Sequence, residues 1–273
     1  TLIELMIAMM LGIIVVGGAM SMYISTIRTS ADIVKSARLN YDLDTTMQLM
    51  VNDLRRAGYW GGAIISGSND FLLENPFSDT NTTVNIRTVA APTTDPTPNS
   101  GDCILYSYDA DGNGNDEDPA NLGNDTAGDA IIASTEYYGF KLEDDAIKIR
   151  YSGTNTTSCS DGNWERITDE DTIKITHLEF NFLPIAAQTA STGVHPALPA
   201  LTASSRCLNS SFAPTATDYI SNSINCTNAV TGNILGQRRV INIHLSGYVK
   251  DDVTLKSLST SVQIRNDRLY TAP

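Results

Sequence analysis

The side chains best suited to chemistry lie in one short acidic segment, residues 109–118, which reads DADGNGNDED. Short oxygen-bearing side chains at alternate positions can converge on one hard cation, and a glycine after them permits the sharp turn that such a loop needs. The segment therefore predicts a structural calcium (Ca2+) site. The candidate ligands are Asp109, Asp111, Asn113, Asn115, Asp116 and Asp118.

This acidic segment departs from an EF-hand calcium loop. Ala120 stands where a bidentate acid belongs, and the flanking residues have the character of strands rather than helices. Asp125 and Asp129 are further candidate ligands, and carboxylates this crowded repel one another unless a cation lies between them. The alternative interpretation is an acidic turn that is simply solvated.

Other kinds of chemistry find no support in the sequence. His177, His195 and His244 lie far apart, and no motif links them to a serine or cysteine nucleophile. Since there is also no CxxC pair, neither an enzyme nor a zinc site is predicted. The net charge of −13 excludes nucleic acid as an expected partner, because an acidic surface repels phosphate.

Four cysteines are present, Cys103, Cys159, Cys207 and Cys226. An even number in an exported chain favours disulfides, although four cysteines allow three pairings. Cys207 and Cys226 bracket a stretch with little periodicity, where a local cross-link would help most. The expected pairs are therefore Cys103–Cys159 and Cys207–Cys226.

The first 24 residues carry one charged side chain, Glu4, and the next charged residue is Arg28. At about 1.5 Å per residue, a helix of this length crosses the roughly 30 Å hydrocarbon core of a bilayer. A secretory signal peptide fits poorly, because neither a basic region nor a small-residue cleavage site accompanies the apolar run. An ordinary membrane anchor with Glu4 at the interface is one interpretation.

The residues TLIEL (1–5) and the apolar run after them resemble the N-terminus of mature type IV pilins. In that family a peptidase removes a basic leader before a phenylalanine, which becomes N-methylated and which this sequence does not include. The resemblance assigns assembly roles to Glu4 and Thr1, with the Glu4 carboxylate neutralising the amino terminus of a neighbouring subunit. This role agrees with physics, because a buried carboxylate needs a cation.

The segment MVNDLRRAGYWGG (50–62) resembles the end of the stem in PilW-like pilins and, more distantly, J-type pseudopilins of type II secretion. The resemblance implies a structural subunit that waits in the inner membrane with the assembly machinery. It is then extracted into an extracellular filament of identical or related subunits. The alternatives are a minor pilin or pseudopilin in a priming or tip complex, and a surface adhesion module carried on a pilus.

Beyond the apolar run, apolar residues recur at helical spacing and predict an amphipathic helix over 26–58 whose apolar stripe packs on a sheet. They are Ile27, Ala31, Val34, Ala37, Tyr41, Leu43, Met47, Met50, Leu54 and Ala57. Charged residues, Asp42 and Asp53 among them, are expected mostly on the other faces. Gly58 is expected to end the helix.

The remaining residues, 59–273, predict a β-rich head, so the fold class is α+β: a long N-terminal helix on a mostly antiparallel sheet. The helix has an apolar half (1–25) and an amphipathic half (26–58). Strands are expected at 83–90, 103–108, 130–138, 146–151, 173–183, 239–250 and 254–265, the last two forming a hairpin. The stretch at about 184–236 is either a surface insertion or a flexible loop.

Overall fold

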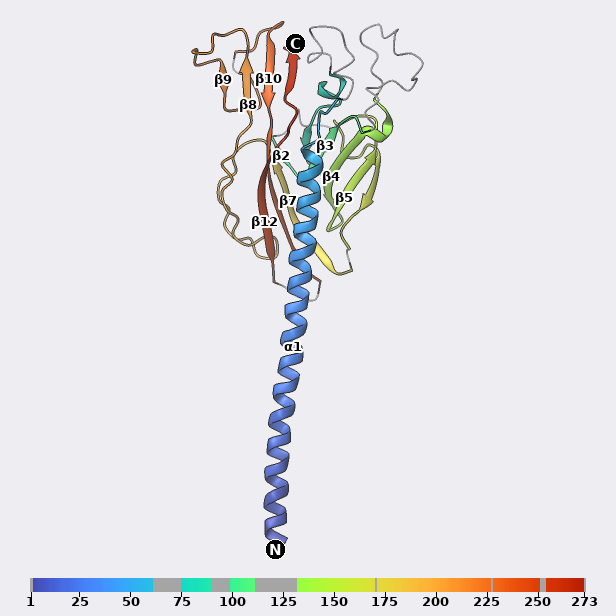
Figure 1. The fold of residues 1–273 in the computed structure, drawn as a ribbon, viewed down its shortest axis with the longest axis vertical. Helices are drawn as coiled ribbons and strands as arrows, with labels where there is room; N and C mark the ends of the chain where they lie inside the picture. The colour runs from blue at the N-terminus through green and yellow to red at the C-terminus, as the bar shows by residue number, and fades with distance from the viewer. Residues whose placement is uncertain are drawn as a thin grey trace.

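The computed structural model describes residues 2–60, 75–89, 99–110, 132–169, 171–226, 228–250 and 254–272. Its dominant element is α1 (Leu2–Leu54), one uninterrupted helix of 53 residues. At a rise of 1.5 Å per residue, a helix of that length extends for about 80 Å. Figure 1 shows that only the C-terminal part of α1 lies against the head, while the rest projects as a stalk.

The described part of the head contains three antiparallel sheets. The first has the order β1 (Asn85–Arg87), β3 (Cys103–Ser107), β4 (Tyr137–Glu143), β5 (Ala146–Ser152) and β6 (Asn163–Arg166). The second has the order β12 (Lys256–Gln263), β11 (Val240–Val249), β7 (Ile173–Asn181) and β2 (Ser100–Gly101). The third has the order β13 (Arg268–Thr271), β10 (Ile234–Arg238), β8 (Arg206–Asn209) and β9 (Ile220–Ser221).

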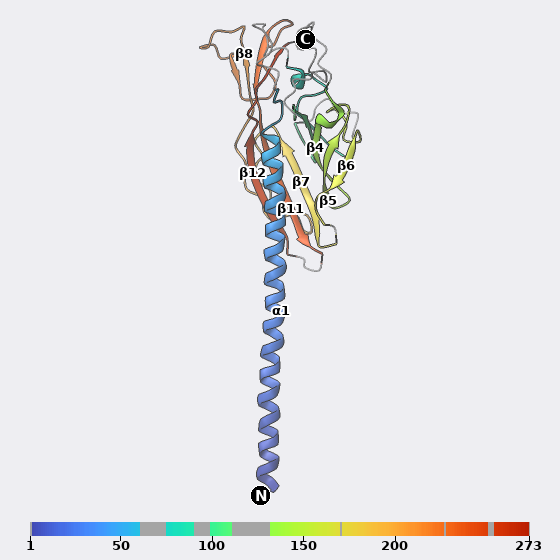
Figure 2. The same ribbon diagram turned by 45° about the vertical axis from the view of Figure 1, so that its right-hand side comes forward.

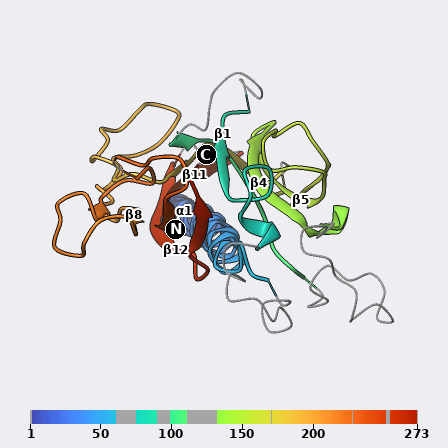
Figure 3. The ribbon, with the colours of Figure 1, turned by 90° about the horizontal axis from the view of Figure 1, so that it is seen from above.

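The upper half of α1 packs against the second sheet, chiefly on β11 and β12 (Figure 2). Met50 and Leu54 of α1 are fully buried, as are Ile243 and Leu245 of β11, and all belong to one hydrophobic core. Seen from above, α1 has the sheet that contains β8 on one side and β4 and β5 on the other (Figure 3). The predicted α+β arrangement of a long helix on antiparallel sheets is thus confirmed.

The lower part of the predicted apolar stripe does not reach the sheet. The first buried residue of α1 is Leu39, which lies outside the predicted stripe. Tyr41 lies beyond Leu39 but is 71% exposed, because it is on the opposite face of the helix. Ile27 and Val34, below the head, are 51% and 67% exposed, and for these two residues the reason is length. A ten-residue strand such as β11 spans about 33 Å, which covers only about 20 residues of a helix.

The end of the helix is fixed by residues distant in the sequence. Gly58 adopts a left-handed conformation (φ +74°), as expected for a helix stop, and a Cβ there would approach Nη2 of Arg239 to 3.1 Å. Asn266 Nδ2 donates to the carbonyl oxygen of Ala57 at 3.1 Å, so it satisfies a backbone group that the helix leaves unpaired. The buried Arg239 in turn donates to the Asn266 carbonyl at 3.0 Å.

The predicted strand at 130–138 is wrong for residues 132–136, and only its last two residues, Tyr137 and Tyr138, belong to a strand. The short 3-10 helix η3 (Ser134–Glu136) precedes β4, which continues to Glu143. A second 3-10 helix, η2 (Pro76–Ser78), follows Asn75, whose side chain caps it. The hairpin expected at 239–250 and 254–265 is confirmed by the pairing of β11 with β12, although its turn at 251–253 lies outside the described residues.

The stretch at 184–236 is a folded insertion in its described part. It supplies β8, β9 and β10, and β10 also pairs with β13 near the end of the chain. These strands have only two to five residues, which is too short for a period-two pattern to be visible in the sequence.

Candidate assembly surface

The apolar half of α1 is uncovered along its whole described length. The most apolar 18-residue window of α1 has a mean hydropathy of 2.4, and none of the residues in that window is buried. By its length and composition, α1 can therefore cross a membrane. Large side chains such as Leu2, Ile13 and Met22 are 81%, 74% and 76% exposed. A continuous exposed apolar surface of this size marks a membrane or protein contact.

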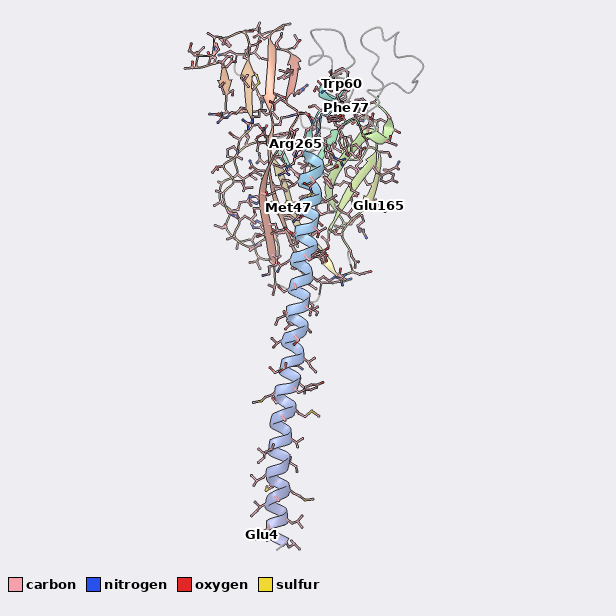
Figure 4. All side chains as sticks on the ribbon, in the orientation of Figure 1. Glu4, Met47, Trp60, Phe77, Glu165 and Arg265 are labelled. Atoms are coloured by element: carbon pink, nitrogen blue, oxygen red, sulfur yellow. A yellow bond between two sulfur atoms is a disulfide. The ribbon has the colours of Figure 1, made fainter. Side chains whose placement is uncertain are left out.

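Glu4 lies in the first turn of α1, at the tip of the stalk farthest from the head (Figure 4). A carboxylate at this position is favoured by the partial positive charge of the helix N-terminus. The side chains around it, such as Leu5 and Ile7, are apolar and exposed. Any partner that covers this end of α1 therefore also has to accommodate a carboxylate. Thr1, the other predicted assembly residue, lies outside the described residues.

The exposed apolar surface continues past the membrane-length segment as a stripe. Met20, Ile27, Val34 and Tyr41 are spaced by seven residues, and each is at least half exposed. Residues seven apart stay close to one face of an α-helix, drifting by about 20° per step. This stripe reaches the level of the head, where Tyr41 faces away from it, and the stripe suits packing against another helix.

The stalk is fastened to the head by the buried carboxylate of Asp53, a position that the sequence did not predict. Asp53 was expected on an outer face, yet it is only 6% exposed. The phenolic hydroxyls of Tyr106 and Tyr108 both donate to its carboxylate, the latter at 3.1 Å. Arg56 forms an ion pair with it from the next turn. These partners explain the burial, because a carboxylate enters a core only when its oxygens are satisfied.

The tyrosines around Asp53 form a stacked group. Tyr108 stacks on Tyr138 with ring centroids 4.2 Å apart, and the Arg56 guanidinium lies 4.6 Å from the Tyr108 centroid. Burial, together with the Asp53 carboxylate, raises the pKa of Tyr106 well above its ordinary value. Its hydroxyl therefore remains a donor at any physiological pH. The joint between stalk and head is therefore held by two buried tyrosine hydroxyls that keep their protons, because the pKa of Tyr108 is raised by burial as well.

Of the predicted calcium ligands, the structure describes Asp109 alone. The other five, Asp111, Asn113, Asn115, Asp116 and Asp118, lie outside the described residues, as do Asp125 and Asp129. Asp109 lies two residues after the end of β3 and is 2% exposed, with its backbone amide donating to the Tyr59 carbonyl at 2.9 Å. Within the described ranges no group of three acidic, histidine or cysteine side chains is arranged to hold a metal ion.

A buried acid that the sequence did not single out lies beside the start of this loop. Glu136 is 3% exposed, and its carboxylate accepts hydrogen bonds from the backbone amides of Ala110, at 3.3 Å, and Ala133, at 2.9 Å. It therefore links Ala110, at the start of the acidic segment, to Ala133, which lies just after residues 111–131 that the structure does not describe. Nothing in its sequence context indicated this role, because the contact joins positions 26 residues apart.

Both disulfides have the expected pairing. Cys103 of β3 is joined to Cys159, and Cys207 of β8 is joined to Cys226, so the described part of the chain contains no free cysteine. The first cross-link ties the loop after β5 to the first sheet, and the second ties the loop after β9 to the third sheet. Both cross-links lie in the head and leave the stalk surface unmodified.

Comparison with known protein families places this geometry in context. The model of the family described as prepilin peptidase-dependent protein B matches residues 32–264, which is more than half of the chain. The match starts in the amphipathic part of α1 and is independent of the TLIEL motif. No curated protein and no solved structure matches the chain. The family is related to the pilins and is of a generally non-enzymatic kind. The long apolar helix, the head with its two disulfides and this match together show that the chain belongs to the prepilin peptidase-dependent protein B family.

Proposed function

We propose that this chain is a structural pilin subunit that is anchored by α1 in the inner membrane and then assembles into an extracellular filament. The observation that carries the proposal is the uncovered apolar half of α1, on a helix whose other end is bonded into a folded head through Asp53. Covering this surface lowers the free energy by about 25 cal/mol per Å2. Lipid can supply that cover before assembly, and neighbouring copies of α1 can supply it afterwards.

Glu4 gives the assembly its specificity in this proposal. In a filament core the carboxylate would be surrounded by apolar side chains, so it requires a cation, and the amino terminus of a neighbouring subunit can supply one. The exposed stripe of Met20, Ile27, Val34 and Tyr41 then extends the contact toward the head. The subunit's partners are therefore identical or related pilins. Its localisation changes from inner membrane to pilus on extraction.

The test replaces Glu4 by glutamine, with Asp32→Asn as the matched control, since Asp32 is an exposed carboxylate farther along α1. The E4Q chain should reach wild-type levels in membranes and be lost from sheared filaments, while the D32N chain should be incorporated normally. Wild-type incorporation of the E4Q chain would contradict the proposal. Counting labelled copies along each filament distinguishes a filament-building subunit from one confined to a tip.

A PilW-like minor subunit in a priming or tip complex is the finer form of this proposal. Its support is the match of residues 53–59 to the stem end of PilW-like pilins. In that case the labelled chain should appear once per filament, and its deletion should reduce the number of filaments. An adhesion module would behave differently, because its loss would leave filament number unchanged and remove attachment.

We also propose that the acidic loop that starts at Asp109 binds Ca2+ and stabilises the head. The support is the DADGN pattern, together with the burial of Asp109 and Glu136 where the loop leaves and re-enters the sheet. A cation whose free concentration is 100 times its Kd stabilises the folded state by about 2.7 kcal/mol.

Chelation should therefore lower the melting temperature of the full chain. The double variant Asp111→Ala, Asp118→Ala should melt at the chelated temperature with or without calcium. Equal melting of the unmodified chain in chelator and in calcium would refute the site.

A further inference from the structure

All three histidines of the chain meet in one place, although they are far apart in the sequence. His177 lies on β7, His244 on β11 and His195 in residues 184–205, a segment that we call the strap. The rings of His177 and His195 have centroids 5.0 Å apart. In the antiparallel register, His244 lies opposite Glu179 of β7. No sequence motif links these histidines, so their convergence is a product of the tertiary fold.

The strap is an irregular hairpin that lies on the outer face of the second sheet, opposite the face that contacts α1. It appears as the tan trace at the left of the head in Figure 1. Its two arms are joined by antiparallel bridges at Ile185–Leu201, Gln188–Leu198 and Ser191–His195. Asn242 of β11 holds both arms, because its Nδ2 donates to the carbonyls of Leu183 and Ala203 at 2.7 Å each.

Several polar atoms in the histidine cluster are buried without a hydrogen-bond partner among the described residues, although Nδ1 of His195 donates to the Pro196 carbonyl at 2.8 Å. His244 is fully buried and His195 is 8% exposed. His244 Nδ1 is paired with the hydroxyl of Ser259 at 2.6 Å, whereas its Nε2 has no hydrogen-bond partner among the described residues. Nε2 of His177 and the hydroxyl of Ser246 are buried without hydrogen-bond partners as well. A protonated imidazole at His244 would therefore present a buried donor with no acceptor.

One carboxylate serves the whole cluster. Glu179 Oε2 lies 3.6 Å from His177 Nε2 and accepts from Gln188 Nε2 of the strap at 3.0 Å. The groups whose charges act on His244 are Glu179 and His177 of β7 and His195 of the strap, while β12 contributes the neutral Ser259. Three imidazoles thus share one compensating charge. Within the described residues no three ligating side chains are placed for a metal ion, so proton binding is the chemistry that this cluster offers.

We propose that His177, His195 and His244 form a pH-sensitive latch that keeps the strap on β7 and β11 at neutral pH and releases it in mildly acidic solution. A first added proton can be balanced by Glu179. A second and a third place like charges beside each other in a buried site, which favours the state in which the strap has lifted and the imidazoles are hydrated. This inference does not depend on the proposed filament function.

The direction of the effect follows from His244. Burial lowers the pKa of its imidazole below the ordinary 6.5, and the two neighbouring histidines lower it further against the opposing effect of Glu179. Since the open state has the ordinary pKa, it binds more protons below pH 6.5, and the closed strap loses stability as the pH falls. At pH 5.5, a His244 imidazole that stays neutral in the closed state raises the open-to-closed ratio up to about tenfold.

Hydrogen exchange of the full chain in detergent micelles tests the latch. Strap peptides within 185–201 are compared at pH 7.5 and pH 5.5 after correction for the intrinsic pH dependence of exchange, with β3 and β4 peptides as the internal reference. We expect strap protection to fall about tenfold or more at the lower pH, while the reference peptides stay unchanged. Equal strap protection at both pH values would overturn the proposal.

Two variants separate proton binding from simple loosening of the strap. His244→Gln cannot take up a proton and should lose most of the pH response. Glu179→Gln removes the one compensating carboxylate and should move the release to higher pH. If H244Q retains the full response, or if E179Q releases the strap at the wild-type pH, the latch does not exist. Should H244Q fail to fold, E179Q alone decides the question.

Discussion

Replacing Asp53 by asparagine tests whether the buried carboxylate fastens α1 to the head. Asparagine keeps the volume and one acceptor oxygen, but it removes the charge that two tyrosine hydroxyls bond to. Hydrogen bonds to a charged group contribute about 1.5–3 kcal/mol each. Because one of the two buried bonds can persist as a neutral bond, we expect the free energy of unfolding to fall by about 2–4 kcal/mol.

Asp42→Asn is the matched control, since it makes the same chemical change on the same helix at a more exposed position. The Asp42 side chain is 34% exposed, and its carboxylate lies 3.7 Å from Nε of Arg38, which is itself 59% exposed. Exposed pairs of this kind contribute about 0–1 kcal/mol. The two substitutions should therefore differ by at least about 1 kcal/mol, with the larger loss at Asp53.

The measurement is urea unfolding of the full chain in micelles, with the tryptophan fluorescence of the head as the signal that reports unfolding. For a domain of this size, 1 kcal/mol corresponds to a shift of about 2–4 °C in melting temperature, so D53N should melt about 4–16 °C lower. Tyr106→Phe should give an intermediate loss, because it removes one of the two buried donors. If D53N and D42N unfold at the same urea concentration, the fastening role assigned to Asp53 is wrong.

Three further outcomes are expected in the same unfolding assay. Met50→Ala, at a fully buried position, should lower the free energy of unfolding by about 2–5 kcal/mol. Leu49→Ala, at the adjacent position that is 42% exposed, should lower it by well under about 1 kcal/mol. Similar losses at the two positions would refute the assigned packing face. Replacing Cys207 and Cys226 together by serine should cost about 3 kcal/mol by the chain-entropy model, and an unchanged midpoint would show that the loop is ordered without the cross-link. Gly58→Ala should lower the free energy of unfolding by about 1–2 kcal/mol, because a φ of +74° disfavours any side chain and a Cβ would crowd the buried Arg239. An unchanged free energy of unfolding would mean that the end of the helix shifts instead.

Several elements could be predicted from the sequence because the spacing of their apolar residues, over a few turns or one strand, is enough to identify them. The apolar run and the stripe through Leu43, Met47 and Met50 have helical periodicity, and they form α1. The long alternating strands β7 and β11 show a period of two, and β11 pairs with β12 in the predicted hairpin. The same reasoning failed for β6, β8, β9, β10 and β13, which have five residues or fewer and were not predicted.

The errors at individual residues share one cause. Asp53 was assigned to an outer face because it is charged, whereas its burial depends on hydroxyls of Tyr106 and Tyr108, more than 50 residues later in the chain. Tyr41 was assigned to the packed face because it is apolar, yet it lies between the buried Leu39 and Leu43 on the face of α1 that points away from the head. Residue type reports what a side chain prefers, and only the assembled fold decides which partner is within reach.

By itself, the sequence determined a long helix with one apolar half, a single carboxylate near its start, a β-rich head and four cysteines in that head. Each of these depends on composition or on spacing within a few turns. The tertiary structure alone decided how far the head covers α1, that Asp53 is a core residue, and that His177, His195 and His244 meet. These features require strands distant in the chain to pair in one register, and the free energy that selects that register comes from closing the whole core rather than from any local segment.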